Sequence, residues 1–458
     1  MHEVDDNQSE FAFASQSSSL DLQLKSCRIA SWSNVLPTNT RRADYEVRGL
    51  NRLRRIPDSL IPRGAGNSFG DCAYLSDGVT LGTRQLTTIS EIDKANNIIL
   101  CGAGVPMGIL HLHLHAQGYS FPVYGGTQWA TVGGAVACDI HGKNVAVEGA
   151  FGRHVESIIL QTADDREIEC SRTNEPELFA ATIGGMGLTG LIRAVRLRLR
   201  PYFNSTVLVQ VARVADMPSM SGAFGQPQPD YEFLSWSNCT DPRSHGLYFY
   251  ATDAPGRRFA RWGRAIQLTL PRVRAFNGWS IRLVKSIERL MIGKYPAHMH
   301  VFSLNYIGVH ERIKSWNRLF GQRGMIEYHF STSAAHFPAT VAALIAECRK
   351  RKIPMFFSVI KKYSDQPQEG LLSFVSPGYG MNFQIHNNEE NRRFLVYFTD
   401  LILERRGRVY LAKDSCILDR QFAAMYDRLE EWRDIARRFD PKNKFQSDQS
   451  RRLRIKEW

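Results

Sequence analysis

Two glycine-rich segments constrain this chain more than any other feature of its sequence. Residues 62–71 read PRGAGNSFGD, and residues 124–144 read YGGTQWATVGGAVACDIHGKN. Glycine has no Cβ, so successive backbone N–H groups in such segments can converge on an anion at close range. A lone Gly-Gly pair would predict only a tight turn between strands. Two segments of the same kind predict a shared site for an anion such as a pyrophosphate.

The length and composition are typical of a globular protein with more than one domain. The chain has 458 residues, of which 43% are hydrophobic and 22% charged. The formal net charge of +13 predicts a surface that attracts phosphates, acidic lipids or nucleic acid. The basic residues form scattered clusters without interleaved aromatic residues, so we expect no nucleic-acid partner.

The cysteines and the first residues of the chain predict a cytoplasmic protein. Eight cysteines are scattered without a CxxC pair, which is typical of reduced thiols and not of a metal site. Residues 1–20 are acidic and rich in Ser and Gln, unlike a secretory signal, and we expect a disordered lead-in. No apolar run approaches the roughly 18 residues of a membrane-spanning helix, so any membrane contact is expected to be peripheral.

Residues 21–200 combine short strands with short helices. Residues 97–104 are predicted to be a strand that ends in glycines, and residues 157–170 a hairpin. Residues 105–117 have helical spacing. His111, His113 and His115 alternate at period two within that helix, so their rings fan out, and we expect solvated histidines and no metal site.

The segment GMGLTG at residues 185–190 matches the GxGxxG pattern of nicotinamide-binding Rossmann units by letter. That pattern requires a strand before it and a helix after it. Here residues 176–183 have the pattern of a helix, and residues 191–199 alternate at period two like a half-buried strand. The order is reversed, so we predict a glycine turn and no Rossmann site.

The composition changes after Pro201. Longer strands rich in aromatic residues then alternate with helices, which predicts a second α+β domain built on an antiparallel sheet over residues 201–409. The expected strands cover residues 247–251, 301–307, 324–332 and 354–361, and the expected helices residues 337–350 and 390–406.

A basic stretch lies between residues 256 and 293 and leads into a helical pattern over residues 281–291. It contains Arg257, Arg258, Arg261, Arg264, Arg272 and Arg274. Two interpretations stay open: a domain helix with a solvated basic side, or a segment that faces a membrane and recruits a lipid-borne substrate.

Taken together, the motifs resemble the vanillyl-alcohol-oxidase type of FAD-binding oxidoreductase. The resemblance rests on RGAGNSFGDCA at 63–73, GGTQWATVGGAVACDIHGKN at 125–144, ELFAATIGGMGLTGLI at 177–192, YLAKDS at 410–415 and FQSDQSRRL at 445–453. Within that family it is most similar to the branch that oxidises a lipid-linked pentose together with a reductase. The resemblance implies an α+β, PCMH-type FAD-binding domain formed by residues 21–200 and 410–458, with a substrate-binding domain inserted at 201–409.

The resemblance also implies a set of cofactor contacts. The backbone of Arg63, Gly64, Ala65, Gly66, Asn67, Ser68, Phe69 and Gly70, and of Thr131, Val132, Gly133 and Gly134, would cradle the pyrophosphate. Gly126, Cys138, Asp139, His141, Ile192 and Tyr410 would contact the rest of the flavin. Some members bind FAD covalently through a histidine in the first loop, where this chain has Asn67. We therefore expect non-covalent FAD, with a link from His141 as the alternative.

Oxidation of an alcohol requires a hydride acceptor, a proton acceptor and positive charge near the flavin. The resemblance assigns the catalytic roles to Lys413 and His141, and places Lys143 and Lys361 beside the substrate. Without the motif, each lysine would be interpreted as a solvated surface group and His141 as a structural histidine in a tight turn.

Three departures from that branch lie on the substrate side. Asn382 occupies the position of a cysteine, His329 that of a glutamine and Phe69 that of a tyrosine. Asn382 and His329 are therefore candidate substrate-binding residues. We expect oxidation of a secondary hydroxyl of a sugar, most simply a polyprenyl-phosphate-linked pentose, with a partner NAD-dependent reductase. The alternative is a free-sugar, alditol or aldonolactone oxidase that uses oxygen.

Overall fold

The computed structural model describes most of the chain: residues 24–45, 53–56, 58–202, 206–217, 219–224, 229–241, 244–254, 271–277, 279–281, 283, 299–302 and 316–458. The predicted lead-in lies outside these residues. So do Arg257, Arg258, Arg261 and Arg264, together with most of the predicted basic helix. The two interpretations of that basic stretch therefore both stay open.

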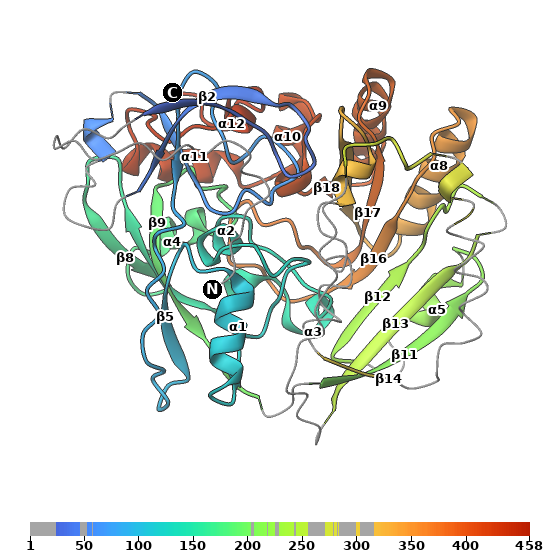
Figure 1. Ribbon diagram of the computed structural model, residues 1–458, viewed down its shortest axis with the longest axis horizontal. Coiled ribbons are helices and arrows are strands. Elements are labelled where there is room, and N and C mark those ends of the chain that lie inside the picture. The colour runs from blue at the N-terminus through green and yellow to red at the C-terminus, as the bar shows by residue number, and fades with distance from the viewer. Residues whose placement is uncertain are drawn as a thin grey trace.

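One half of the molecule contains two four-stranded sheets (Figure 1). The first has the order β1 (Lys25–Ile29), β2 (Thr38–Asp44), β4 (Val79–Gly82) and β3 (Leu60–Arg63), and β4 runs parallel to both of its neighbours. The second is antiparallel, with the order β5 (Ile98–Gly102), β9 (Leu191–Arg198), β7 (Val155–Gln161) and β8 (Glu167–Ser171). The helices here are α1 (Met107–His115), α2 (Val132–Ala137), α3 (Val145–Glu148) and α4 (Pro176–Thr182).

The other half is built on an eight-stranded antiparallel sheet. Its order is β14 (Met299–Phe302), β11 (Thr206–Val214), β13 (Gly246–Ala254), β12 (Tyr231–Ser235), β16 (Ser358–Tyr363), β17 (Gly378–His386), β15 (Met325–Thr332) and β18 (Arg408–Val409). A short ribbon of β6 (Tyr119–Ser120) and β10 (Arg200–Pro201) precedes it in the chain. The predicted domain boundaries at residues 201 and 410 stay a prediction, and the sheet's first and last described strands lie just inside them.

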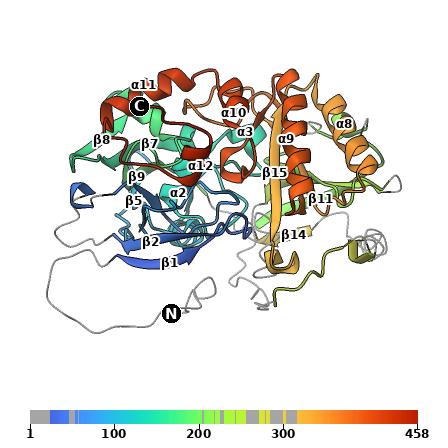
Figure 2. The same cartoon turned by 90° about the horizontal axis from the view of Figure 1, so that it is seen from above.

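The two faces of the large sheet differ in chemistry because side chains alternate along each strand. In β15, Ile326, Tyr328 and Phe330 belong to the apolar core shared with α8 (Phe337–Lys350) and α9 (Glu389–Glu404), which lie on one face of the sheet (Figure 2). Glu327 and His329 alternate with them and are also buried. The second face therefore presents polar groups without exposing them to bulk water.

The C-terminal segment returns to the first half of the molecule (Figures 1 and 2). It forms α10 (Asp419–Met425), α11 (Leu429–Phe439) and α12 (Asp448–Arg452). Leu60 at the start of β3 donates its amide to the carbonyl of Lys444 at 2.8 Å and accepts from the amide of Gln446 at 2.9 Å. The tail thus pairs with the edge strand β3, which leads into the first glycine segment.

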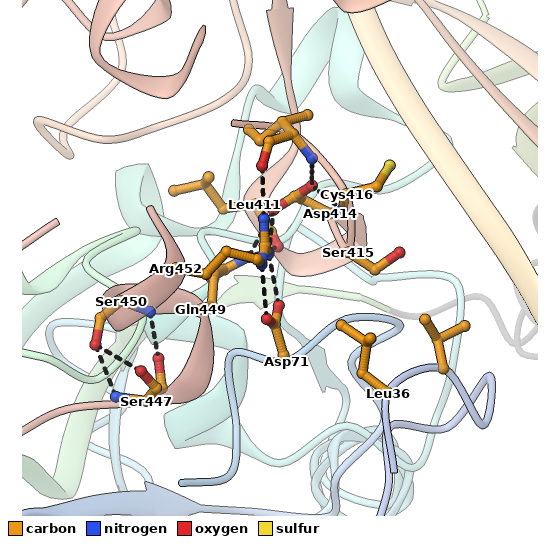
Figure 3. Close-up of polar contacts among 12 residues, drawn as sticks. Leu36, Asp71, Leu411, Asp414, Ser415, Cys416, Ser447, Gln449, Ser450 and Arg452 are labelled. Carbon is orange, nitrogen blue, oxygen red and sulfur yellow. Dashed lines mark hydrogen bonds and ion pairs between the residues drawn. The ribbon is translucent and has the colours of Figure 1, made fainter. Parts of the chain in front are cut away.

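A buried ion cluster joins this tail to the first glycine segment (Figure 3). The Arg452 guanidinium lies 2.7 Å from a carboxylate oxygen of Asp71 and 2.7 Å from one of Asp414. The side chains of Asp71 and Asp414 are 3% and 0% exposed. Because buried carboxylates need a charged partner, this one arginine holds together two segments that are far apart in sequence.

Most predicted elements are confirmed, and one prediction is wrong. The α+β class is confirmed, and the GMGLTG segment follows a helix, α4, and precedes a strand, β9, which is the reverse of the Rossmann order and confirms its rejection. The prediction of three solvated histidines fails at His111, which is 1% exposed. Its ring contacts those of Phe121 and Tyr124 and is hydrogen-bonded to the Tyr124 hydroxyl, because that side of α1 faces the core.

We expect the substitution Arg452→Met to lower the free energy of unfolding by about 3–5 kcal/mol, because it leaves two carboxylates buried without their cation. Arg393→Met is the matched control. Arg393 pairs with Glu389 on the surface, where the two side chains are 79% and 77% exposed. Chemical denaturation of both variants measures the difference, and equal stabilities would contradict a structural role for the cluster.

Candidate active site

The two glycine-rich segments meet in space. A Cβ on Gly64 would lie 2.2 Å from Oγ1 of Thr131, and a Cβ on Gly70 would lie 1.6 Å from the carbonyl oxygen of Asp414. Neither contact tolerates a side chain, so glycine is required at both positions by close packing. The Phe69 amide also donates to the carbonyl of Ala412 at 3.0 Å. Three segments that are distant in sequence therefore converge here.

The backbone amides of the two segments are used differently. In the second, the amides of Val132 and Gly133 donate to the carbonyls of Val105 and Ala103 at 3.0 and 2.8 Å. Residues 132–137 form α2, which Thr131 caps by accepting from the amide of Gly134 at 3.3 Å. In the first, no acceptor among the described residues pairs with the amides of residues 64–68. The first segment thus offers the donors that an anion requires.

The surroundings of the first segment fit the diphosphate of a dinucleotide. The side-chain nitrogen of Asn67 is buried without a hydrogen-bond partner, and buried amides rarely stay unpaired in a complete site. The space beside Gly126 is open, with no atom within 4 Å of its Cβ position. The Arg63 guanidinium, by contrast, donates to the carbonyls of Ala73 and Ala30 at 3.1 Å each, and so braces the loop from behind.

A cluster of rings lies between the loops and the polar face of the large sheet. The ring centroid of His141 lies 5.1 Å from that of His329, 5.4 Å from Tyr363 and 5.2 Å from Tyr410. The Tyr363 hydroxyl and Nε2 of His329 are 2.8 Å apart. Nδ1 of each histidine is buried without a partner. The predicted residues His141, His329 and Tyr410 therefore share one cluster.

Lys413 reaches the same cluster from the short helix η5 (Leu411–Lys413). Its ammonium group lies 2.5 Å from Oε1 of Glu327 and 5.3 Å from the ring centroid of Phe69. The same Oε1 accepts from the side-chain amide of Asn382 at 3.0 Å. Two predicted site residues, Lys413 and Asn382, are thus joined through a carboxylate.

Burial, and then the charges in this cluster, determine the protonation of its bases. Burial, followed by the positive charge of Lys413, lowers the pKa of Lys361 to about 7, although Glu327 acts in the opposite direction. Burial and the neighbouring lysines hold the pKa of His141 well below 6.5. Burial, Lys413 and His141 do the same for His329. Both histidines are therefore neutral at pH 7, and a fraction of Lys361 is neutral as well.

The remaining predicted residues lie around the cluster in structural roles. Asp139 accepts from the amide of Gly152 at 2.8 Å and from the Ser373 hydroxyl at 2.5 Å, and burial raises its pKa to about 6. The carbonyl of Cys138 accepts from the Tyr410 hydroxyl at 2.8 Å. Ile192 is buried in β9. Their predicted contacts with the flavin stay a prediction.

Lys143 lies against the large sheet further from the rings. Its ammonium group is 4.3 Å from the ring centroid of Phe233 on β12, and its carbonyl accepts from the amide of Glu232 at 2.8 Å. Lys143 is therefore placed at β12, beside the sheet face that carries Lys361, and β16 and β17 separate it from Glu327 and His329 on β15.

Sequence reasoning missed several residues of this cluster. Glu327 and Gln384 share a hydrogen bond of 2.8 Å across β15 and β17, and Phe374 lies 4.9 Å from His329 between ring centroids. The signal for Glu327 was present: it is a carboxylate two residues before His329 in a fully buried strand, and alternation puts both on one face. Phe374 lies on a loop, and no periodicity marks its position.

Comparison with known proteins agrees with this geometry. Residues 50–171 match a family model described as "FAD binding domain". The chain is 28% identical over 454 residues to a decaprenylphosphoryl-beta-D-ribose oxidase from Mycolicibacterium smegmatis, which covers 93% of this chain and 97% of that protein. The protein is an FAD-dependent oxidoreductase. Its resemblance to oxidases with a PCMH-type FAD-binding domain is thereby confirmed, and FAD is its cofactor.

Two further relatives match only part of the chain. It is 27% identical over 160 residues to mouse L-gulonolactone oxidase, which covers 35% of this chain and 36% of that protein. It is 29% identical over 140 residues to an alditol oxidase from a Streptomyces species, over 30% of this chain and 33% of that protein. Within the described residues there is no helix long and apolar enough to cross a membrane.

We expect Gly64→Ala to weaken FAD binding roughly 10- to 100-fold, because its methyl group would displace Thr131 and force the two segments apart. Gly222→Ala in α5 (Met220–Ala223) is the control, since nothing lies within 4 Å of its Cβ position. Titration of the apoproteins with FAD measures both dissociation constants. Equal values would show that the contact between the segments does not shape the site.

Proposed function

We propose that this protein oxidises a secondary hydroxyl of a polyprenyl-phosphate-linked pentose to a ketone, as the first half of an epimerisation. An NAD-dependent reductase would complete the epimerisation by reducing the keto sugar from the other side. When bound, FAD supplies the two-electron oxidant that accepts the hydride. The full-length similarity to the mycobacterial oxidase supports this substrate class.

The observation that supports the proposal is the order of polar, cationic and apolar side chains across one face of the large sheet. Cross-strand partners share a face, and the row runs from His329 on β15 through Asn382 on β17 to Val359 on β16. Lys361 and Lys143 follow in the same direction. Polar groups suited to a sugar are thus succeeded by cations suited to a phosphate.

Beyond the cations the same face becomes apolar. Phe233 on β12 stacks on Phe249 of β13 with ring centroids 4.9 Å apart. These rings belong to a cluster with Val207, Val209, Val211, Tyr231, Ala251 and Val359. A sugar, a phosphate and a hydrocarbon chain succeed one another in the proposed substrate in the same order. A free sugar or polyol would leave the apolar end of this face unused.

The cofactor would be held by the first glycine segment. The unpaired amides of residues 64–68 would bind the pyrophosphate, and Asn67 would donate its buried amide to the cofactor. Lys413 and Glu327 would border the reacting end, with His141 beside them. On the substrate side, His329 and Asn382 would orient the sugar hydroxyls. A buried, hydrogen-bonded cluster of this kind excludes water from the reaction.

Because the reacting substrate carries a long apolar chain, the protein would work at a membrane surface. The positive net charge and the basic stretch at residues 256–293 would favour anionic lipids.

We expect FAD to be bound non-covalently, because the amide of Asn67 cannot form the bond that a histidine makes. Precipitation with acid should therefore leave the yellow colour in the supernatant. If the colour stays in the pellet, a covalent link exists, and His141 is the side chain to examine by peptide mapping.

The reaction itself is tested by anaerobic bleaching of the flavin with a panel of polyprenyl-phosphate sugars, nucleotide sugars and polyols. We expect the polyprenyl-phosphate pentose to bleach the wild type fastest. The variant Lys413→Ala should bind FAD but bleach at least about 100-fold more slowly. Bleaching by polyols alone, with hydrogen peroxide formed in air, would favour the alternative that the alditol and lactone oxidases suggest.

A further inference from the structure

The carboxylate of Glu327 is a buried charge in the middle of the cluster, and the sequence analysis assigned it no role. Its side chain is 5% exposed. One oxygen, Oε1, lies 2.5 Å from the ammonium group of Lys413 and 3.0 Å from the side-chain nitrogen of Asn382. The other, Oε2, accepts from the side-chain nitrogen of Gln384 at 2.8 Å. Three donors therefore converge on one carboxylate.

This arrangement places the buried carboxylate of Glu327 among three donors, of which the ammonium group of Lys413 is the charged one. A buried carboxylate in turn requires a cation, and Lys413 is in contact with it. An ammonium group that is bound to a carboxylate contributes positive charge at a fixed place. Because it is already protonated, it cannot accept the proton of the substrate.

Lys361 has a different environment on the same sheet face. It lies on β16 opposite Gly380 of β17, on the side of the strand that also carries Tyr363. No ion pair among the described residues involves its ammonium group. Burial and Lys413 lower its pKa to about 7, so near neutral pH about half of the molecules hold it as a free amine.

We propose that Glu327 is a positioning residue that holds Lys413 as a fixed cation, and that Lys361 is the residue that accepts the hydroxyl proton of the substrate. This assignment rests on the proposed function. The carbon–hydrogen bond of the alcohol breaks, and its electron pair leaves with the hydrogen as a hydride to the oxidant, FAD. The oxygen–hydrogen bond breaks as its proton passes to Nζ of neutral Lys361, which becomes an ammonium group, and the ketone forms.

The two histidines are less suited to this step. Burial and the neighbouring lysines hold their pKa values well below 6.5, so both rings are weak bases. Nε2 of His329 is also engaged with the Tyr363 hydroxyl. They can position a sugar hydroxyl through their unpaired Nδ1 atoms, while the stronger base receives the proton.

The fixed charges are tested on the midpoint potential of bound FAD at pH 8.5, where Lys361 is mostly neutral. Glu327→Gln removes a negative charge and should raise the potential, since reduction adds negative charge to the flavin. Lys413→Met should lower it for the opposite reason. The double variant restores the net charge and should return close to the wild-type value.

The control for these single and double variants is Glu389→Gln on α9. Glu389 is an exposed carboxylate that is paired with an arginine, as Glu327 is paired with a lysine, and its loss should not move the potential. The assignment of Glu327 and Lys413 is overturned if either single variant keeps the wild-type potential. Circular dichroism and the bound FAD per protein verify that each variant is folded.

The proton acceptor is tested by Lys361→Met, with the member of the sugar panel that bleaches the wild type. The wild-type bleaching rate should rise through about pH 7, because the neutral amine is the accepting form. In the variant this rise should disappear and the rate at pH 8.5 should fall about 100-fold or more, while the potential stays at the wild-type value. An unchanged rate would overturn the role of Lys361.

The two kinds of failure are distinguishable. The potentials depend only on bound FAD, so they decide the charges of Glu327 and Lys413 whichever sugar is the substrate. If the polyprenyl-phosphate pentose fails to bleach the flavin of the wild type and a polyol succeeds, the proposed substrate is wrong. The bleaching rates of the wild type and of Lys361→Met with that polyol then decide the role of Lys361.

Discussion

The contact of Arg452 with Asp71 and Asp414 is the interaction on which the rest of the structure depends. Asp71 ends the first glycine segment, and Asp414 follows the lysine that reaches the active site. Neither carboxylate is accessible to solvent, so their charges are compatible with burial only while the arginine of the last helix lies between them. The C-terminal tail therefore brings the first glycine segment and the segment that carries Lys413 together, although almost the entire large sheet separates them in sequence.

The large sheet provides the second constraint, because its two faces have opposite functions. One face is apolar and packs on α8 and α9, which fixes the strands in register. The other face is then determined by the strict alternation of side chains. Glu327 and His329 can face the glycine loops only because Ile326, Tyr328 and Phe330 face the helices. Apolar packing on one face therefore fixes which side chains point toward the glycine loops from the other face.

The sequence predicted the local features well where a single element decides them. The helix before GMGLTG and the strand after it follow from periodicity. The prediction that fails concerns a residue whose environment is set by contacts with distant segments. His111 lies on the side of α1 that also carries Met107 and Leu114, and the contacts with Phe121 and Tyr124 show that this side is buried deeply enough to include the histidine. The second glycine pair also depends on distant segments, because the carbonyls of Ala103 and Val105 accept the amides of Gly133 and Val132. Its predicted contact with the pyrophosphate stays a prediction.

The sequence by itself determined the class of protein: the two glycine segments, the lysine motif near the end and the change of composition at Pro201 are sufficient for an FAD-binding α+β oxidoreductase. Only the tertiary structure decided how charge is distributed at the site. Whether a lysine is a cation or a base depends on which groups lie within a few ångströms and on how much water is excluded, and both follow from contacts between residues far apart in the chain. Lys413 and Lys361 have the same side chain, and the carboxylate of Glu327 contacts only one of them.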